Sequence, residues 1–455
     1  MAKSFKKHDM TLGNPLKVLL LFAVPMFLGQ IFQQFYNVAD MKIVGMKLGD
    51  NALAAISSVS SVFGILMGVA NGLNNGCAIT VARMYGADNK QMLRRTLASM
   101  LCINFTAVAL FSIVGISFMN PLMALMKVPE NLKADAKVYL TFILCGMITT
   151  MAYNMCASVL RSVGNSRTPL YFLIGSSIVN VTLDYLFVVK TELGVGGAAA
   201  ATIIAQGISA LLCLGYIIKY VPELHISKKD FVFDKVLLKE LLAMGFSMSL
   251  ITSLVSFGSA AVNRANNILS ARYGEGIITA NSAARRIDGL IMMPMSTLGM
   301  ALSTFVSQNR GAGHYERINR GIKGALSVGA AWCALGVACL YAFGDFLVKF
   351  ITGTDSETVT VHAVEYMRIN SPFFFLLMVL LVFRSVLQGF GKKIIPIVTA
   401  AAELVLKFFA AAILVPHLGF LGICVAEPVI WTVSAIIVAA VYIKDMKSIK
   451  KQYNF

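Results

Sequence analysis

The stretch VLRSVGNSRTP at residues 159–169 returns, with its spacing intact, as VLQGFGKKIIP at residues 386–396. In both copies a Val-Leu pair is followed by a glycine, Gly164 or Gly391, and five residues later by a proline. The second copy lies in the second half of the chain and the first copy in the first half. This recurrence indicates that the chain contains a duplicated unit.

The sequence around this stretch repeats with nearly the same offset. Gly86-Ala87 returns at Gly311-Ala312, and Leu193-Gly194 returns at Leu418-Gly419, so these two motifs are shifted by an identical amount. Only small insertions therefore separate the two copies. Many secondary transporters are built from repeated membrane units, with the substrate bound where the repeats meet. The pattern predicts a carrier.

The composition is that of a membrane protein. The chain is 57% hydrophobic and 13% charged, with a mean hydropathy of +0.75, which lies outside the range of soluble domains. Apolar runs long enough to cross a hydrocarbon core of ~30 Å recur along it. We predict an all-α membrane protein of twelve transmembrane helices, at residues 15–45, 52–84, 95–120, 135–162, 168–190, 195–220, 236–271, 277–309, 318–350, 358–390, 393–415 and 420–443.

The longest polar stretch falls between the repeats. We therefore predict an N-terminal lobe at 1–222 (helices 1–6), a cytoplasmic linker at 223–235 and a C-terminal lobe at 236–455 (helices 7–12). Six crossings per repeat give both lobes the same orientation, which predicts a pseudo-two-fold axis along the membrane normal. No cleavable signal peptide is expected, because residues 1–14 are polar and the first apolar run is too long for a signal core.

The positive charge predicts topology. The net charge is +17, and 25 of the 39 Lys and Arg residues fall on one predicted side of the membrane, in the N-terminal segment, the tail 444–451 and the segments 83–95, 161–167, 219–239, 310–323 and 392–393. This positive-inside pattern places both termini in the cytoplasm. We accordingly expect no nucleic-acid partner.

Cysteine and histidine indicate no metal site and no cofactor. The eight cysteines lie in apolar runs, without a C-x-x-C motif or a histidine partner, and are best explained as small buried side chains. The five histidines are scattered over loops and helix ends, so their spacing assembles no metal site.

Four acidic residues lie at membrane depth, where a charge costs several kcal/mol unless it is paired, hydrated or functional. They are Asp40, Asp184, Glu403 and Glu427. Gln33, Tyr36 and Asn37 precede Asp40 at spacings that place all four residues on one helical face.

Asp184 has a polar neighbour of its own. Asn180 lies one turn before it, and Thr202 follows a run of small residues on the sixth predicted helix. Two carboxylates, an amide and a hydroxyl form a suitable nest for Na⁺, and two desolvated carboxylates close together favour holding a proton on one of them. The alternative is that these side chains are satisfied separately and only hold helices together.

The second repeat offers other polar candidates. Lys407 follows Glu403 by four residues, the favourable order for an ion pair within a helix, and Arg384 is the alternative partner. Glu427 precedes Pro428, where it either hydrogen-bonds at a kink or contacts substrate. Whether these residues, Arg264, Arg285 and Arg286 face a cavity is left open.

Two features concern helix geometry. Gly64, Gly68, Gly72 and Gly76 form a ridge that permits close approach of another helix. Pro25 offers a bending point on the helix that carries Asp40.

These motifs resemble bacterial multidrug and toxic compound extrusion (MATE) transporters of the MOP superfamily. The similar segments are Met10–Leu16, Phe35–Asp40, Ile43–Gly45, Val159–Asn165, Asn180–Asp184 and Gln308–Gly313, and the resemblance covers essentially the whole chain. It implies a V-shaped pair of six-helix lobes in the bacterial cytoplasmic membrane, which export organic, often cationic, compounds in exchange for H⁺ or Na⁺. In the archaeal and DinF-like branch the cation site lies in the first lobe, and Asp40, Asn180, Asp184 and Thr202 match its pattern.

The chain departs from the family at several positions. Aligning Gly49 with Gly274 places Ala265 opposite Asp40, and helix seven lacks the acid that the NorM branch uses there. Lys42 stands where the family normally has a neutral residue, so its role is open. We therefore expect an asymmetric ion site, confined to the first lobe.

The resemblance and the polar residues together predict a monomeric antiporter that works by alternating access. A small organic substrate binds against Gln33, Tyr36, Asn37 and Asp40, and the coupling cation binds at Asp40, Asn180, Asp184 and Thr202 while helix one shifts near Pro25. The main alternative is a lipid-linked oligosaccharide flippase of the same superfamily, with Arg264, Arg285, Arg286 and Arg384 binding a pyrophosphate. A membrane enzyme is not expected, because no clustered catalytic acids or metal ligands are present.

Overall fold

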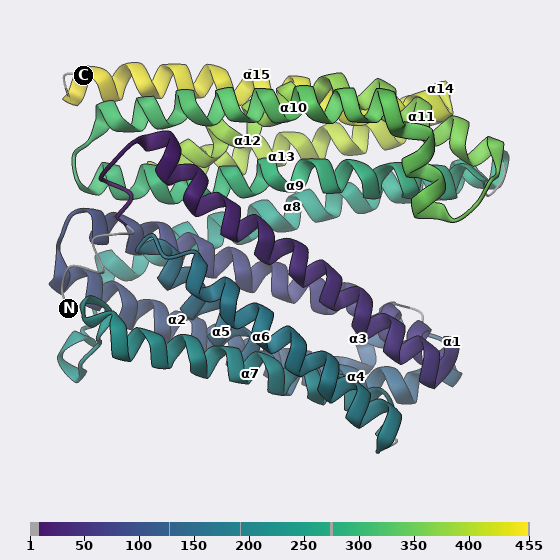
Figure 1. Cartoon of the computed structure of the whole chain (residues 1–455), viewed down its shortest axis with the longest axis horizontal. Helices are drawn as coiled ribbons and strands as arrows, with labels where there is room; N and C mark the ends of the chain where they lie inside the picture. The colour runs from purple at the N-terminus through teal and green to yellow at the C-terminus, as the bar shows by residue number, and fades with distance from the viewer. Residues whose placement is uncertain (1–8, 127, 192, 274–275, 454–455) are drawn as a thin grey trace. The chain divides into compact units, whose positions relative to one another are not determined.

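The chain is almost entirely helical. A computed structural model describes residues 9–126, 128–191, 193–273 and 276–453, and every regular element in these residues is a helix (Figure 1). Among these described residues, eleven helices are long and apolar enough to cross a membrane, and Glu130–Cys145 with Met147–Ser162, bent by 44° at their junction, count as a twelfth when the bent pair is taken as one span. The predicted fold class is confirmed.

The helices form two compact units. The first contains Leu21–Ser249, and the second contains Met10–Leu20 and the chain from Leu250 onward. Each unit thus includes the start of a long helix whose remainder belongs to the other unit. The predicted lobes and linker, at residues 1–222, 223–235 and 236–455, were defined by the sequence repeats and remain a prediction. The compact units are defined by how the helices pack, so their boundaries differ.

The first unit is built around α1, which runs from Pro15 to Gly86. Gly49, with φ 78° and ψ −176°, is the one residue of α1 with non-helical dihedral angles, and it separates the first two predicted spans. A positive φ is accessible to glycine at little cost. The helices that follow are α2 (Lys90–Ser117), α3 (Met119–Leu125), η2 (Glu130–Leu132), α4 (Lys133–Cys145), α5 (Met147–Ser162), α6 (Arg167–Asp184), η3 (Tyr185–Lys190) and α7 (Gly194–Tyr220).

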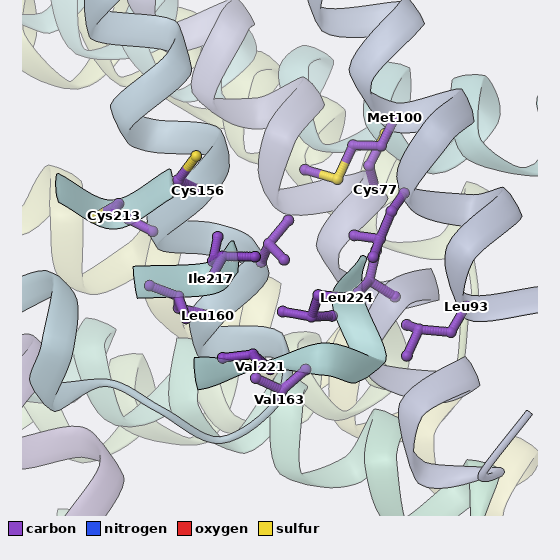
Figure 2. Close-up of a cluster of buried hydrophobic side chains, with 14 of the residues drawn as sticks. Cys77, Leu93, Met100, Cys156, Leu160, Val163, Cys213, Ile217, Val221 and Leu224 are labelled. Atoms are coloured by element: carbon purple, nitrogen blue, oxygen red, sulfur yellow. The ribbon is translucent and has the colours of Figure 1, made fainter. Parts of the chain in front are cut away.

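A buried apolar cluster holds the end of α1 against α2, α5 and α7. Figure 2 shows Leu93 and Met100 of α2, Leu160 of α5 and Ile217 of α7 among its side chains. Cys77, Cys156 and Cys213 belong to it as small apolar groups, as the sequence predicts. The prediction is wrong for Cys102 and Cys145, whose side chains are exposed on the surface of the unit.

The predicted linker packs onto this cluster. Leu224, in the short helix η4 (Pro222–Leu224), is a buried member of it. In η5 (Lys228–Asp230) the carboxylate of Asp230 accepts hydrogen bonds from the backbone and the hydroxyl of Ser227, both at 2.7 Å. These hydrogen bonds hold the pKa of Asp230 below its ordinary value.

Two glycines of the predicted ridge lie against the backbone of a neighbouring helix in the first unit. A Cβ added to Gly72 would lie 2.5 Å from the backbone of Ser249, and one added to Gly76 would lie 2.4 Å from the carbonyl oxygen of Met244. Both partners belong to α8 (Lys235–Tyr273). A Cβ added to Gly64 or to Gly68 would have no atom of another element within 4 Å. The ridge is therefore a packing surface over half its length.

We expect Gly76→Ala to lower the thermal stability of the purified protein in detergent, because α8 backbone would have to move. Overpacking of this kind typically costs about 1–3 kcal/mol. Gly64→Ala is the matched control, since a methyl group there meets open space. Equal melting temperatures for the two variants would contradict the close contact with α8.

The second unit contains the rest of α8 and the elements of the second repeat. They are α9 (Gly276–Gly311), α10 (Tyr315–Thr352), α11 (Glu357–Asn370), η6 (Ser371–Phe373), α12 (Phe374–Gly389), α13 (Ile394–Phe409), η7 (Ala410–Leu414), α14 (Val415–Leu418) and α15 (Phe420–Tyr453). In Figure 1, α9, α10, α12 and α15 run alongside one another; α9, α10 and α12 pack against each other, and α15 packs against α12.

The N-terminal segment packs within the second unit. Arg317 donates hydrogen bonds to the carbonyl oxygens of Met10 and Leu12, and the backbone N–H of Met10 donates to Gln308. Asn14 then accepts hydrogen bonds from the N–H groups of the first turn of α1. The MTLGNPL motif at residues 10–16 therefore leads into the start of α1, and Gln308 and Arg317 hold it through hydrogen bonds to its backbone.

Both repeats interrupt the same span with a π-helical segment. In the first, η3 follows Asp184, and in the second, η7 follows Phe409. Such π segments are frequent at functional sites. The sequence did not predict them.

Candidate cation-binding site

The site in the first unit is formed by α1 and the end of α6. Asp184 and Asn180 are fully buried on α6, and Asp40 is half-buried on α1. The carboxyl groups of Asp40 and Asp184 lie within hydrogen-bonding reach of each other. The fold therefore brings together two acids that are far apart in the sequence.

These polar atoms are poorly satisfied by the protein itself. Both carboxyl oxygens of Asp184, Oδ1 of Asp40 and both side-chain polar atoms of Asn180 are buried without a hydrogen-bond partner among the described residues. No basic side chain in the described part of the chain forms an ion pair with either carboxylate. A hydrogen bond between two carboxyl groups requires a proton on one of them, so without a proton these oxygens have no donor.

Leaving two such carboxylates charged and unpaired at membrane depth is costly. A proton shared between them, or a small cation bound by their oxygens, removes that cost. Hard monovalent cations prefer oxygen ligands, and the donors here are carboxylate, amide and hydroxyl oxygens. Of the residues that the structure describes, no three His, Cys, Asp or Glu side chains gather as a metal cluster would. The residues fit H⁺ or Na⁺ better than a transition metal.

Two tyrosines border the carboxylates. The hydroxyl of Tyr36 lies close to the side chain of Thr202 of α7 and to the carboxyl groups of Asp40 and Asp184. Tyr139 of α4 also lies close enough to both acids to interact electrostatically. Thr202, a predicted ligand of the cation, and Tyr36, a predicted substrate contact, thus both lie beside the two acids. Tyr139 was missed, because a single tyrosine within an apolar run carries no signal by itself.

The remaining first-repeat candidates have different positions. Asn37 is half-buried, whereas Gln33 is exposed one turn further from the acids. The backbone of α1 keeps helical dihedral angles at Pro25, so bending there stays a prediction about motion. Lys42 is exposed and forms no ion pair with the described acids. It therefore does not neutralise Asp40.

The second unit holds paired charges in its interior. Arg384 of α12 forms a buried ion pair with Glu403 of α13, so Arg384 rather than Lys407 is the partner of Glu403. Lys407 instead lies 3.8 Å from Glu427 of α15. The intrahelical pair of Glu403 and Lys407, one of the two alternatives from the sequence, is not formed.

Glu427 is also close to α9. Arg285 lies 3.7 Å from its Oε1, and the buried Asp288 lies close to both Arg285 and Glu427. Asp288 was missed in the sequence, because the run Arg285-Arg286-Ile287-Asp288 has the composition of a helix end. Arg264 and Arg286 are exposed.

Comparison with known proteins places the chain in a family. The family model described as MatE matches residues 25–186 and 248–413, which together make up most of the chain. The chain belongs to the MatE family. The two matches are nearly equal in extent and lie one in each half of the chain, so the duplication seen in the sequence is that of the MatE unit.

Individual relatives cover most of this MatE chain. It is 28% identical to "Probable multidrug resistance protein YpnP" of Bacillus subtilis, over 81% of this chain and 82% of the relative. It is also 28% identical to "Probable multidrug resistance protein YoeA" of the same organism, over 75% and 74%. The structure titled "Crystal structure of MATE in the bent conformation" superposes with a TM-score of 0.91 at 22% identity, over 98% of each chain, which shows a shared fold.

Proposed function

We propose that this membrane protein is a multidrug efflux antiporter, which exports organic compounds, cationic or amphiphilic in character, in exchange for H⁺ or Na⁺. Membership in the MatE family and relatives named as multidrug resistance proteins support export of small organic molecules. The observation that carries the coupling is the contact of Asp40 with Asp184, two acids without a basic partner among the described residues.

The coupling follows from differential binding. A cation drives a conformational change only when it binds one state more tightly than the other. A site of two carboxylates that needs a proton or Na⁺ supplies such a dependence if its geometry differs between the inward-open and outward-open states. Tyr36 links this site to α7, because its hydroxyl lies close to both acids and to Thr202. Gln33, Tyr36 and Asn37 remain our candidates for contact with substrate.

The flippase alternative is less well supported. Recognition of a pyrophosphate requires arginines with free donors and a net positive environment. Arg384 is neutralised by Glu403, and Arg285 lies beside Glu427 and Asp288. The interior charges of the second unit are therefore largely compensated.

The proposal is tested by efflux of a cationic dye from inverted vesicles under separately imposed proton and sodium gradients. We expect one of the two gradients to drive dye transport well above the rate in vesicles that contain no transporter. The responding gradient identifies the coupling ion. Folded protein that moves dye under neither gradient would refute the antiporter, and lipid-linked substrates would be tested next.

A further inference from the structure

The repeat register identifies counterparts of the cation site in the second unit. The helices α6 and α13 begin at Arg167 and Ile394, and carrying this shift along both helices aligns Asn180 with Lys407. The shift that relates Gly194 of α7 to Gly419, just before α15, aligns Thr202 with Glu427. A tyrosine of the second repeat, Tyr366 on α11, lies close to Glu427, as Tyr139 on α4 lies close to Asp40 and Asp184.

The chemistry at these counterparts is changed. Asp40 corresponds to Ala265 when Gly49 is aligned with Gly274, and the register of α13 places Ala411 opposite Asp184. Both acids of the first unit are therefore replaced by alanine. The second unit instead carries the ammonium group of Lys407 where the first has the amide of Asn180. It carries the carboxylate of Glu427 where the first has the hydroxyl of Thr202.

The ammonium group of Lys407 lies inside this second polar centre. Its Nζ is 3.8 Å from Oε1 of Glu427 and donates a hydrogen bond of 3.0 Å to the hydroxyl of Ser259. The side chains of Lys407 and Glu427 are only 7% and 10% exposed. A Cβ on Gly258 would lie 2.6 Å from Cδ of Lys407, so a glycine leaves the room through which the lysine stem passes.

We propose that Lys407 is a tethered cation, which permanently holds in the second unit the place that an exchangeable cation takes in the first. The role of the first unit in this comparison rests on the proposed function. The second unit is then fixed in the equivalent of its cation-loaded form, and ion exchange with solvent is left to Asp40 and Asp184.

The local charge balance supports this assignment. Among the described residues, Arg285 and Lys407 are the basic side chains within 4 Å of Glu427, and the buried carboxyl group of Asp288 lies close to Arg285 and Glu427. Removing the lysine charge leaves the buried carboxylate of Glu427 with one basic neighbour, Arg285 at 3.7 Å. An uncompensated buried charge is strongly unfavourable, so the truncated site should recruit a small cation from solution.

The test is thermal unfolding of the full-length protein in detergent, and it needs no transport. All variants carry Asp184→Asn, so that cation binding at the first site does not contribute. In this background we expect Lys407→Ala to be destabilised and then rescued by ethylammonium, a primary ammonium ion small enough to replace the missing group. Choline at equal ionic strength is the control, because its trimethylated nitrogen has no N–H to donate. Ligand binding to the folded state raises the melting temperature, here by about 2–4 °C.

Three further variants separate a tethered cation from ordinary packing. Lys407→Arg keeps the charge, so its stability should not depend on ethylammonium. Lys407→Met fills the space of the lysine stem and leaves room only for a smaller cation, so it should gain stability from Na⁺ over choline but not from ethylammonium. The double variant Lys407→Met with Glu427→Gln removes the carboxylate that the lysine compensates and should fold without cation dependence. Equal melting temperatures of Lys407→Ala in ethylammonium and in choline, together with equal melting temperatures of Lys407→Met in Na⁺ and in choline, would overturn the proposal.

Discussion

Asp184→Asn is expected to reduce gradient-driven export by at least about tenfold, which is within the usual range of coupling between two binding events. Asparagine has the shape of aspartate but can neither release a proton nor supply a charge to Na⁺. Asp184 is fully buried, both its carboxyl oxygens lack a donor among the described residues, and its neighbour is Asp40. The measurement is dye efflux from inverted vesicles under the gradient that drives the parent.

The loss should not come from unfolding. With asparagine at 184, the pair of acids becomes an acid and an amide, and the amide N–H can donate to Asp40. We therefore expect the melting temperature of Asp184→Asn in detergent to equal or exceed that of the parent. Asp50→Asn makes the same change at an exposed acid beyond the break at Gly49 and should transport normally. If Asp184→Asn retained full gradient-driven export, the assigned site would be wrong.

The first-unit site could be predicted because its signals are local. Gln33, Tyr36 and Asn37 share a helical face with Asp40, and each intramembrane acid stands out against an apolar run. The fold class was equally accessible, since twelve long apolar runs in two copies leave few architectures. The spacing of residues along one helix does not indicate which residue of another helix lies next to them. Tyr139 of α4 was missed for this reason.

The second unit shows the limits of reading one helix at a time. Glu403 has a lysine at the favourable spacing on its own helix, yet the fold supplies Arg384 from α12 and turns Lys407 toward Glu427. Tertiary contacts outweigh an intrahelical pair that is worth only a few tenths of a kcal/mol. The compact units were not predictable either, because they depend on packing such as that of Gly76 against α8.

Arg384→Met is expected to be the most destabilising substitution in the second unit, lowering the free energy of unfolding by about 3–5 kcal/mol. Arg384 and Glu403 pair with side chains only 10% and 9% exposed, so removal of the arginine leaves a buried carboxylate without its partner. Thermal unfolding in detergent measures the effect. Arg286→Met is the matched control, because Arg286 is exposed on α9 and its loss should change the melting temperature little.

The double variant Arg384→Met with Glu403→Met separates the cost of an orphaned charge from the value of the pair itself. A buried ion pair loses in desolvation much of what it gains in attraction, so replacing both members with apolar side chains is often neutral or stabilising. We therefore expect the double variant to recover most of the stability lost in Arg384→Met. A double variant as unstable as the single one would show that Arg384 acts by packing or through another partner. Recovery of stability with normal export would then place this ion pair outside the transport mechanism, whereas recovery with lost export would show that the charges are needed for transport.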